Sequence, residues 1–189
     1  MVTRKLPSPL FLSMPITEVF GKRRSTREFS AEPLSPELLS TLLWSTAGKT
    51  DELGHRTVPS AKGAREIDAY VFDKDGVWRY DEVEHQLIMT NDKDMRGETT
   101  LAQGFVKDAS VTLVFAADDE ALTKLDPTRT DRCAAIDAGC MAFAAQLAAT
   151  AMGMPSVIRA SVHIEKTRRA IGLANVTPLL AITVSMPKL

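Results

Sequence analysis

The sequence contains little of what most catalytic and metal-binding motifs need. Among 189 residues there are two cysteines and three histidines, and the formal net charge is -1. A protein with this balance of acidic and basic residues lacks the overall positive potential of nucleic-acid-binding domains. No G-x-S-x-G element occurs and His55, His85 and His163 are isolated, so neither a serine hydrolase nor a metal site is indicated. No G-x-G-x-x-G follows a predicted strand, which gives no support to a Rossmann nicotinamide site.

The sequence also shows no disulfide pattern and no export signal. Cys133 and Cys140 lie in a predicted helix, where their backbones are separated by about 10 Å along the axis. That separation is too long for a disulfide, so both residues are predicted to be buried thiols. Residues 1–13 predict an irregular N-terminal arm, interrupted by Pro7 and Pro9, with no long apolar core. We expect a cytoplasmic protein with no membrane partner, unless an export signal precedes the printed sequence.

Hydrophobic periodicity and turn residues predict mixed helices and strands, which we interpret as one domain over residues 1–189. The clearest helix is 36–47, which Ser35 can cap and Gly48 ends. A hairpin is predicted at 66–80, around an Asp-Gly turn. Further elements are helices at 15–22 and 162–173, the latter capped by Ser161 and ended by Gly172, and strands at 110–117, 155–161 and 178–186. This mixture is typical of an α+β fold.

The segment 131–152 predicts a helix that is apolar nearly all round. Such a helix must be covered on every side. Asp137, Gln146 and Thr150 interrupt it too often for a membrane span. A chain of this length has little room to wrap a helix completely, so we expect the helix to pack partly against a second copy of the protein.

Fixed positive charge is concentrated in the segment 21–30, GKRRSTREFS. In an extended stretch Arg23, Ser25 and Arg27 share one face, while Arg24 points the opposite way. Two guanidinium groups and a hydroxyl on one side form a receptor for a phosphate. Two alternatives remain open at this point. One is a solvated basic turn, and the other is a nucleic-acid patch, which fits poorly with the net charge and the lack of nearby aromatic stacking groups.

Six stretches, taken in order, resemble the nitroreductase family of flavin enzymes, most closely its compact branch with the azoline-oxidising dehydrogenases of peptide modification. They are KRRSTREFS (22–30), LSPELLSTLLWSTAG (34–48), TVPSAKGAREIDAYVF (57–72), GVWRYDEVEHQL (76–87), DAGCMAFAAQLAATAMGMPSVIRAS (137–161) and LLAITVSMPK (179–188). The resemblance implies an FMN-binding homodimer of α+β fold. It also implies a central, mostly antiparallel sheet flanked by helices, a buried central helix and a flavin at the dimer interface.

The resemblance assigns roles to the arginine segment. Arg23 and Ser25 would hold the FMN phosphate, helped by Arg24. Arg27 falls where the family places a cation against the N1/O2 edge of the flavin. A fixed guanidinium there stabilises the negative charge left by two-electron reduction and raises the reduction potential. Lys188 matches a basic residue that pairs with the phosphate, the alternative being a mobile terminal lysine.

The resemblance also predicts two other contacts with the cofactor. Pro59, Ser60 and Ala61 would reach the flavin from the partner subunit, although on its own the stretch predicts only a turn. Arg159 and Ala160 would offer backbone N–H groups to flavin N5 and O4. The chain departs from its relatives in two places. Phe143 and Ala144 replace a polar pair, and Lys62 and Arg65 favour an anionic substrate.

We therefore predict an FMN-dependent oxidoreductase that passes a hydride from NAD(P)H through flavin N5 to a small acceptor such as a nitroaromatic or a quinone. The flavin carries this chemistry and no catalytic side chain is assigned. Two alternatives are kept. One is a flavin dehydrogenase or oxidase that acts on a heterocycle or a modified peptide, and the other is a flavin-binding protein without turnover.

Overall fold

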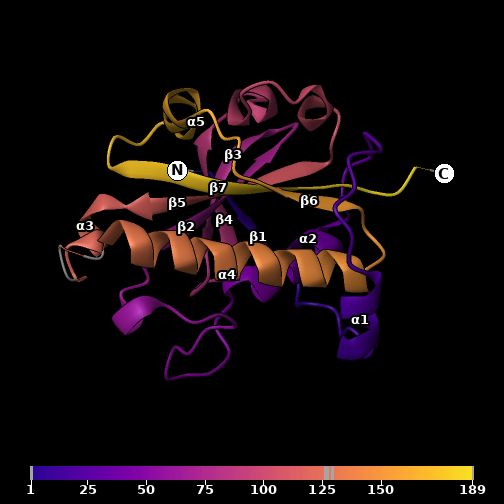
Figure 1. Ribbon diagram of the computed structural model, residues 1–189, viewed down its shortest axis with the longest axis horizontal. Helices are drawn as coiled ribbons and strands as arrows, with labels where there is room; N and C mark the ends of the chain where they lie inside the picture. Colours follow the sequence, from indigo (N-terminus) through magenta and orange to yellow (C-terminus); the bar gives the residue numbers. More distant parts are fainter. Residues whose placement is uncertain (1, 126–127, 129, 189) are drawn as a thin grey trace.

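The computed structural model describes residues 2–125, 128 and 130–188. Its centre is a seven-stranded sheet in the order β1-β4-β3-β2-β5-β7-β6, with every neighbouring pair antiparallel (Figure 1). The strands are β1 (Thr3–Lys5), β2 (Ile67–Asp73), β3 (Gly76–Asp81), β4 (Gln86–Asn91), β5 (Val111–Asp118), β6 (Ser156–Arg159) and β7 (Val176–Val184). The predicted α+β class with an antiparallel sheet is confirmed.

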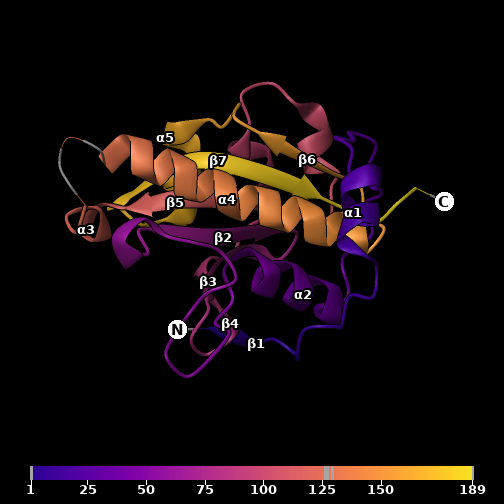
Figure 2. The same ribbon diagram turned by 60° about the horizontal axis from the view of Figure 1, so that its bottom comes forward.

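Helices cover both faces of this sheet. They are α1 (Ile16–Lys22), α2 (Pro36–Ala47), α3 (Asp119–Leu122), α4 (Thr130–Ala151) and α5 (Ile164–Ile171), with single 3₁₀ turns η1 (Ala61–Gly63), η2 (Arg96–Thr99) and η3 (Gly104–Lys107). Figures 1 and 2 show α4 running across one face with α2 beside it, while α5 lies on the opposite face. Each face therefore has its own apolar core, one around α2 and α4 and the other around α5.

The hairpin and the α2 helix form where local signals predicted them. Asp73 Oδ1 accepts hydrogen bonds from the backbone N–H groups of Asp75 and Gly76, both at 2.9 Å, which closes the turn between β2 and β3. A Cβ atom at position 76 would lie 2.4 Å from the carbonyl oxygen of Asn91, so only glycine fits there. Ser35 Oγ accepts from the N–H of Leu38 and so caps α2.

Several predictions are corrected by the structure. The arm 1–13 is not wholly irregular, because Thr3–Lys5 forms β1 and pairs with β4. The N-cap of α5 is His163 rather than Ser161, whose hydroxyl donates instead to Gln103 Oε1 at 2.8 Å. Cys133 and Cys140 are free thiols as predicted, but both are only half-buried.

The α4 helix is not covered on every side by its own chain. Length and composition alone would let it cross a membrane, yet half of its most apolar window is buried in the protein. It packs on α2, β7 and β6. Its outward side carries Ile136, which is 54% exposed, and Phe143, which is 42% exposed. Exposed large apolar side chains on a helix with a buried opposite face indicate a surface suited to protein contact.

Candidate functional site

The arginine segment is held against the sheet by backbone contacts and one aromatic anchor. The N–H of Thr26 donates to the carbonyl oxygen of Ser156 at 2.9 Å, and the N–H of Ser30 donates to that of Met186 at 3.2 Å. Between them Phe29 is buried and packs on Phe105, with ring centroids 5.5 Å apart. The segment therefore passes beside the start of β6 and the residues that follow β7.

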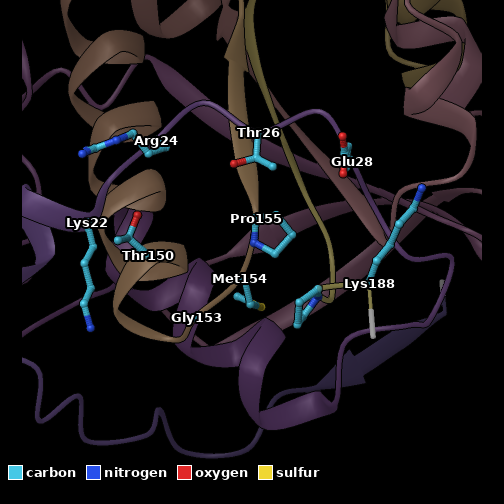
Figure 3. Close-up of a pocket in the computed structure, with 10 residues that line it drawn as sticks. Lys22, Arg24, Thr26, Glu28, Thr150, Gly153, Met154, Pro155 and Lys188 are labelled. Carbon is cyan, nitrogen blue, oxygen red and sulfur yellow. The ribbon is translucent and has the colours of Figure 1, made fainter.

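Alternate side chains of this segment point to different sides. Lys22, Arg24, Thr26 and Glu28 line a cavity of about 460 Å³ (Figure 3). Its other lining residues are Thr150, Gly153, Met154, Pro155, Pro187 and Lys188. The side chains predicted to share a face, those of Arg23, Ser25 and Arg27, are not among them. This alternation is what an extended stretch requires, and it places Lys188 on the same side as Arg24.

The predicted phosphate ligands of the segment have few partners within the chain. Arg23 Nη1 lies 3.4 Å from Oε1 of Gln146 on α4. Gln146 is buried, and its Nε2 has no hydrogen-bond partner in the described residues. Ser25 and Arg27 are exposed. A buried amide donor without an acceptor, beside a guanidinium group, is suited to an anionic ligand because such a donor costs free energy when left unpaired.

The remaining cations at this end of α4 also lack acidic partners. Arg24 Nη1 donates to the carbonyl oxygens of Gly21 and Arg23, at 2.9 and 2.7 Å. The ion pairs found between described residues include none of the four basic residues Arg23, Arg24, Arg27 and Lys188. The uncompensated positive charge of these residues makes this end of α4 attractive to anions.

The predicted flavin-contacting loop 59–65 lies elsewhere on α4. The N–H of Ala61 donates to Asp137 Oδ2 at 2.6 Å, which attaches the loop to the N-terminal half of the helix. Gln146, the neighbour of Arg23, is nine residues further along, or about 14 Å at 1.5 Å per residue. In one chain the structure therefore does not bring Pro59, Ser60 and Ala61 to the arginine segment.

The two residues predicted to present backbone N–H groups lie at the end of β6. Ala160 follows the strand directly and is exposed. The Arg159 side chain is buried, and it donates to Thr183 Oγ1 at 2.9 Å and to Thr99 O and Oγ1 at 3.3 Å. Burial without a carboxylate lowers the pKa of Arg159 to about 10. Its side chain thus fixes the end of β6 to η2.

Phe143 and Ala144, predicted to replace a polar pair, are exposed and half-buried, respectively, on α4. Phe143 stacks on Phe20 of α1, with ring centroids 6.3 Å apart. Ala144 lines a shallow apolar cavity of about 260 Å³ together with Leu12, Met14, Ile16, Val19, Ser45, Leu147, Ala148 and Ala151. We call the exposed part of this region, formed by Ile16, Phe20, Ile136 and Phe143, the apolar face.

The histidines occupy separate positions. His55 contacts Asp51 on the surface, His85 lies between Tyr80 and Ser40, and His163 caps α5. In the residues that the structure describes, no group of three or more His, Cys, Asp or Glu side chains is placed to hold a metal ion.

Sequence reasoning missed three polar side chains near α4. Gln146 and Asp137 were noted only as interruptions of an apolar helix, and Glu66 only as the start of a strand. All three are buried. A buried polar residue in an otherwise apolar helix was the available signal, since such residues need partners.

Comparison with known proteins shows which family the chain belongs to. The model of the Nitroreductase family matches residues 21–185. The chain belongs to the nitroreductase family. It is 32% identical over 164 residues to a nitroreductase homologue of Methanocaldococcus jannaschii, and the match covers 82% of this chain and 83% of that protein. The resemblance found in the sequence is confirmed.

Solved structures agree with the fold of this chain. The crystal structure of a nitroreductase homologue from Ralstonia eutropha JMP134 superposes with a TM-score of 0.93 at 34% identity, over 99% of this chain and 90% of that chain. The NADPH:FMN oxidoreductase of Vibrio harveyi, solved with NAD+, gives a TM-score of 0.68 at 20% identity, over 92% of this chain and 69% of that chain. The family supports a flavin-dependent oxidoreductase in general terms.

Proposed function

We propose that this member of the nitroreductase family is an FMN-dependent oxidoreductase that takes a hydride from NAD(P)H and passes it to a small acceptor such as a nitroaromatic or a quinone. The observation that carries the proposal is the group of unpaired cations at the C-terminal end of α4, beside the unsatisfied Nε2 of Gln146. A nitroreductase fold with an anion-binding end on α4 fits a cofactor that has a phosphate tail.

The arginine segment would hold the cofactor by charge. Arg23 and Ser25 would bind the phosphate, and Gln146 Nε2 would gain an acceptor. Arg24 and Lys188, which line the cavity on the other side of the segment, would add positive charge to the phosphate site. Arg27 would lie against the N1/O2 edge of the ring. When bound, FMN supplies two-electron redox chemistry between the nicotinamide and the acceptor. The guanidinium of Arg27 favours negative charge at that edge, so it raises the reduction potential.

The strand end after β6 would orient the ring. Backbone N–H groups of Arg159 and Ala160 would donate to N5 and O4, which fixes the reactive edge of the ring without a catalytic side chain. The buried Arg159 side chain, bonded to Thr99 and Thr183, holds that backbone in place. Exposure of Ala160 keeps the position open to a ligand.

A homodimer would complete the site. Pro59, Ser60 and Ala61 lie about 14 Å along α4 from the residues beside Gln146, so within one chain the loop does not join the arginine segment. If two α4 helices pack antiparallel about a two-fold axis, the N-terminal half of one lies beside the C-terminal half of the other. The apolar face, with Ile136 and Phe143, supplies the surface for that packing.

The acceptor would be anionic. Lys62 and Arg65 are both exposed on the loop that we assign to the flavin pocket of the partner subunit. Neither forms an ion pair with another described residue. A carboxylate or phosphate on the substrate would meet these charges at the mouth of the pocket. We place the enzyme in the cytoplasm, where NAD(P)H is supplied.

The absorption spectrum of the purified protein tests this function. We expect a yellow protein whose flavin bands bleach when NADH or NADPH is added without oxygen, and recover when a nitroaromatic or quinone follows. Bands that neither nicotinamide bleaches would favour the dehydrogenase or the flavin-binding alternative. A colourless protein that FMN cannot reconstitute would overturn the proposal, and salt-sensitive retention on DNA would then support a nucleic-acid patch.

A further inference from the structure

Two buried carboxyl groups at the base of the loop 59–65 have no role in the function proposed above. Glu66, the residue before β2, is 0% exposed, and Asp137 on α4 is 6% exposed. Neither forms an ion pair with any residue that the structure describes. Two ionised carboxylates buried side by side without a cation would be strongly unfavourable, because each loses hydration and repels the other.

The hydrogen bonds around the pair leave one position open for a proton. Asp137 Oδ2 accepts from the Ala61 N–H, and Glu66 Oε2 accepts from Ser60 Oγ at 3.2 Å. Glu66 Oε1 is buried and has no donor from other described groups. The two carboxyl groups bind consecutive residues of the loop, Ser60 and Ala61, so both lie at the same point of its base. A proton on Glu66 Oε1 would turn the unpaired oxygen into a donor toward the Asp137 carboxylate and would remove one of the two buried negative charges.

The loop held by this pair is conformationally strained. Lys62 and Arg65 have φ values of 51° and 54°, in the left-handed region that residues with a side chain rarely adopt. Such strain persists only where the surroundings fix the backbone. Part of the loop is fixed by its own 3₁₀ turn, in which the N–H groups of Gly63 and Ala64 donate to the carbonyl oxygens of Ser60 and Ala61. The carboxyl pair supplies further contacts. Besides the Ala61 bond to Asp137, Ser60 Oγ accepts from the N–H of Arg65 at 2.8 Å while it donates to Glu66.

We propose that Glu66 and Asp137 share a single proton and act as a positioning pair, which holds the loop 59–65 in the shape that presents Pro59, Ser60 and Ala61 to the flavin of the partner subunit. The target of the loop rests on the proposed function, whereas the shared proton does not. When the proton leaves, the two negative charges repel each other. The repulsion moves the two carboxylates apart and out of line with the Ala61 N–H and the Ser60 hydroxyl, so the strained loop relaxes.

The electrostatic surroundings favour a proton on Glu66. Burial raises the pKa of Glu66, and the negative charge of Asp137 raises it further. The cations of the loop do not compensate, because Lys62 is exposed and the Arg65 guanidinium bonds to the carbonyl oxygen of Gly54. On the neighbouring strands, Asp68 faces Arg79 at 4.0 Å, and the Asp118 carboxylate caps α3. A rise in pH through the raised pKa of Glu66 is therefore the condition that removes the proton.

Flavin-free protein provides the direct test. Infrared spectra of the wild type at pH 7 should show the C=O stretch of a protonated carboxylic acid that Glu66→Gln removes. Hydrogen exchange of the Ala61 N–H should accelerate when that band disappears at alkaline pH, relative to the rest of the chain. In Glu66→Gln the amide mimics the protonated acid, so this acceleration should be lost. Asp137→Ala removes the acceptor and should give fast exchange at every pH.

A matched control comes from β2, the strand that follows Glu66. Asp68→Asn changes a carboxyl group on β2 that does not contact the loop, so the alkaline acceleration at Ala61 should persist in it. The proposal is overturned if the wild type has no Glu66-dependent acid band, or if Glu66→Gln retains the alkaline acceleration.

The link to the flavin needs a separate measurement. In protein reconstituted with FMN, the midpoint potential of the wild type should shift at the pH where the band disappears, and Glu66→Gln should lose that shift. The acid band and the exchange of Ala61 could respond to pH while the potential of bound flavin does not. That result would overturn the proposed contact between the loop and the flavin, but not the shared proton. Failure to bind FMN at all would contradict the proposed function instead.

Discussion

The two ends of α4 carry functional groups of opposite kind. At the C-terminal end, Arg23, Arg24 and Arg27 are fixed charges that lack acidic partners within the described chain and are accessible to a ligand. At the N-terminal half, Glu66 and Asp137 are hidden, and they act on the exposed loop 59–65 only through hydrogen bonds. The first region would recognise an anion directly, whereas the second would set the shape of a loop. We therefore assign binding to the exposed end with the arginines, and positioning of the loop to the two buried carboxyl groups.

The largest expected effect comes from separating the two regions. In the proposed homodimer, the arginine segment of one chain meets the loop 59–65 of the other across the apolar face. Ile136→Asp should abolish dimerisation, because a buried charge in an apolar interface costs several kcal/mol. Flavin retention should be lost with the dimer. Light scattering and the flavin content of the purified protein measure both. Val83→Asp alters an equally exposed apolar residue in the turn between β3 and β4, and it should leave the dimer intact. A dimeric, yellow Ile136→Asp protein would show that α4 does not form the interface.

Arg23→Ala tests the arginine segment by itself. Loss of a charge-assisted hydrogen bond to phosphate costs about 1.5 to 3 kcal/mol, which corresponds to a roughly 10-fold to 150-fold weaker affinity for FMN. Fluorescence titration of apoprotein with FMN measures this change. Arg169 is an exposed arginine on α5, on the other face of the sheet, so Arg169→Ala should bind FMN like the wild type. Equal affinities of the two variants would contradict the phosphate assignment.

Arg27→Ala should affect the potential more than the affinity. Removal of the cation at the N1/O2 edge disfavours the reduced cofactor, so the midpoint potential should fall by about 30 mV for each tenfold loss in the two-electron equilibrium. Spectroelectrochemical titration measures the fall. Arg27→Lys keeps the charge and should recover most of the potential, whereas a potential unchanged in Arg27→Ala would remove Arg27 from the ring edge.

The two regions also differed in how far the sequence predicted them. The arginine segment and the β2–β3 hairpin depend on neighbouring residues, so their patterns were visible along the chain. The β1 strand could not be predicted in this way, because Thr3–Lys5 is ordered by pairing with Gln86, Leu87 and Ile88. Likewise Ser161 is a good capping residue, but a tertiary bond to Gln103 takes its hydroxyl. Glu66 and Asp137 are far apart in sequence, and only the packing of α4 on the sheet joins them.

Substitution of Glu66 should have a smaller effect, which is a change in how stability depends on pH. The pKa of Glu66 is raised above its ordinary 4.5, so above this pH the folded state holds more protons than the unfolded state. Stability of the wild type therefore falls as pH rises through the folded pKa. Glu66→Gln cannot titrate at this position, so thermal unfolding should show that its stability relative to the wild type increases as the pH rises above 4.5. Asp94→Asn provides a contrast of opposite sign, because hydrogen bonding to Arg96 lowers the pKa of Asp94.

The smallest effect is expected where the loop meets the substrate. Lys62 is exposed and forms no ion pair with the described residues, so its charge acts on an anionic acceptor only through solvent. Lys62→Met should raise KM severalfold for a nitrobenzoate but not for the matching nitrobenzamide, with kcat unchanged for both. The difference should vanish at high salt, since screening removes an exposed charge interaction but not a packing contact. Equal changes for the acid and the amide would mean that Lys62 shapes the loop, as Glu66 and Asp137 do, rather than selecting the acceptor.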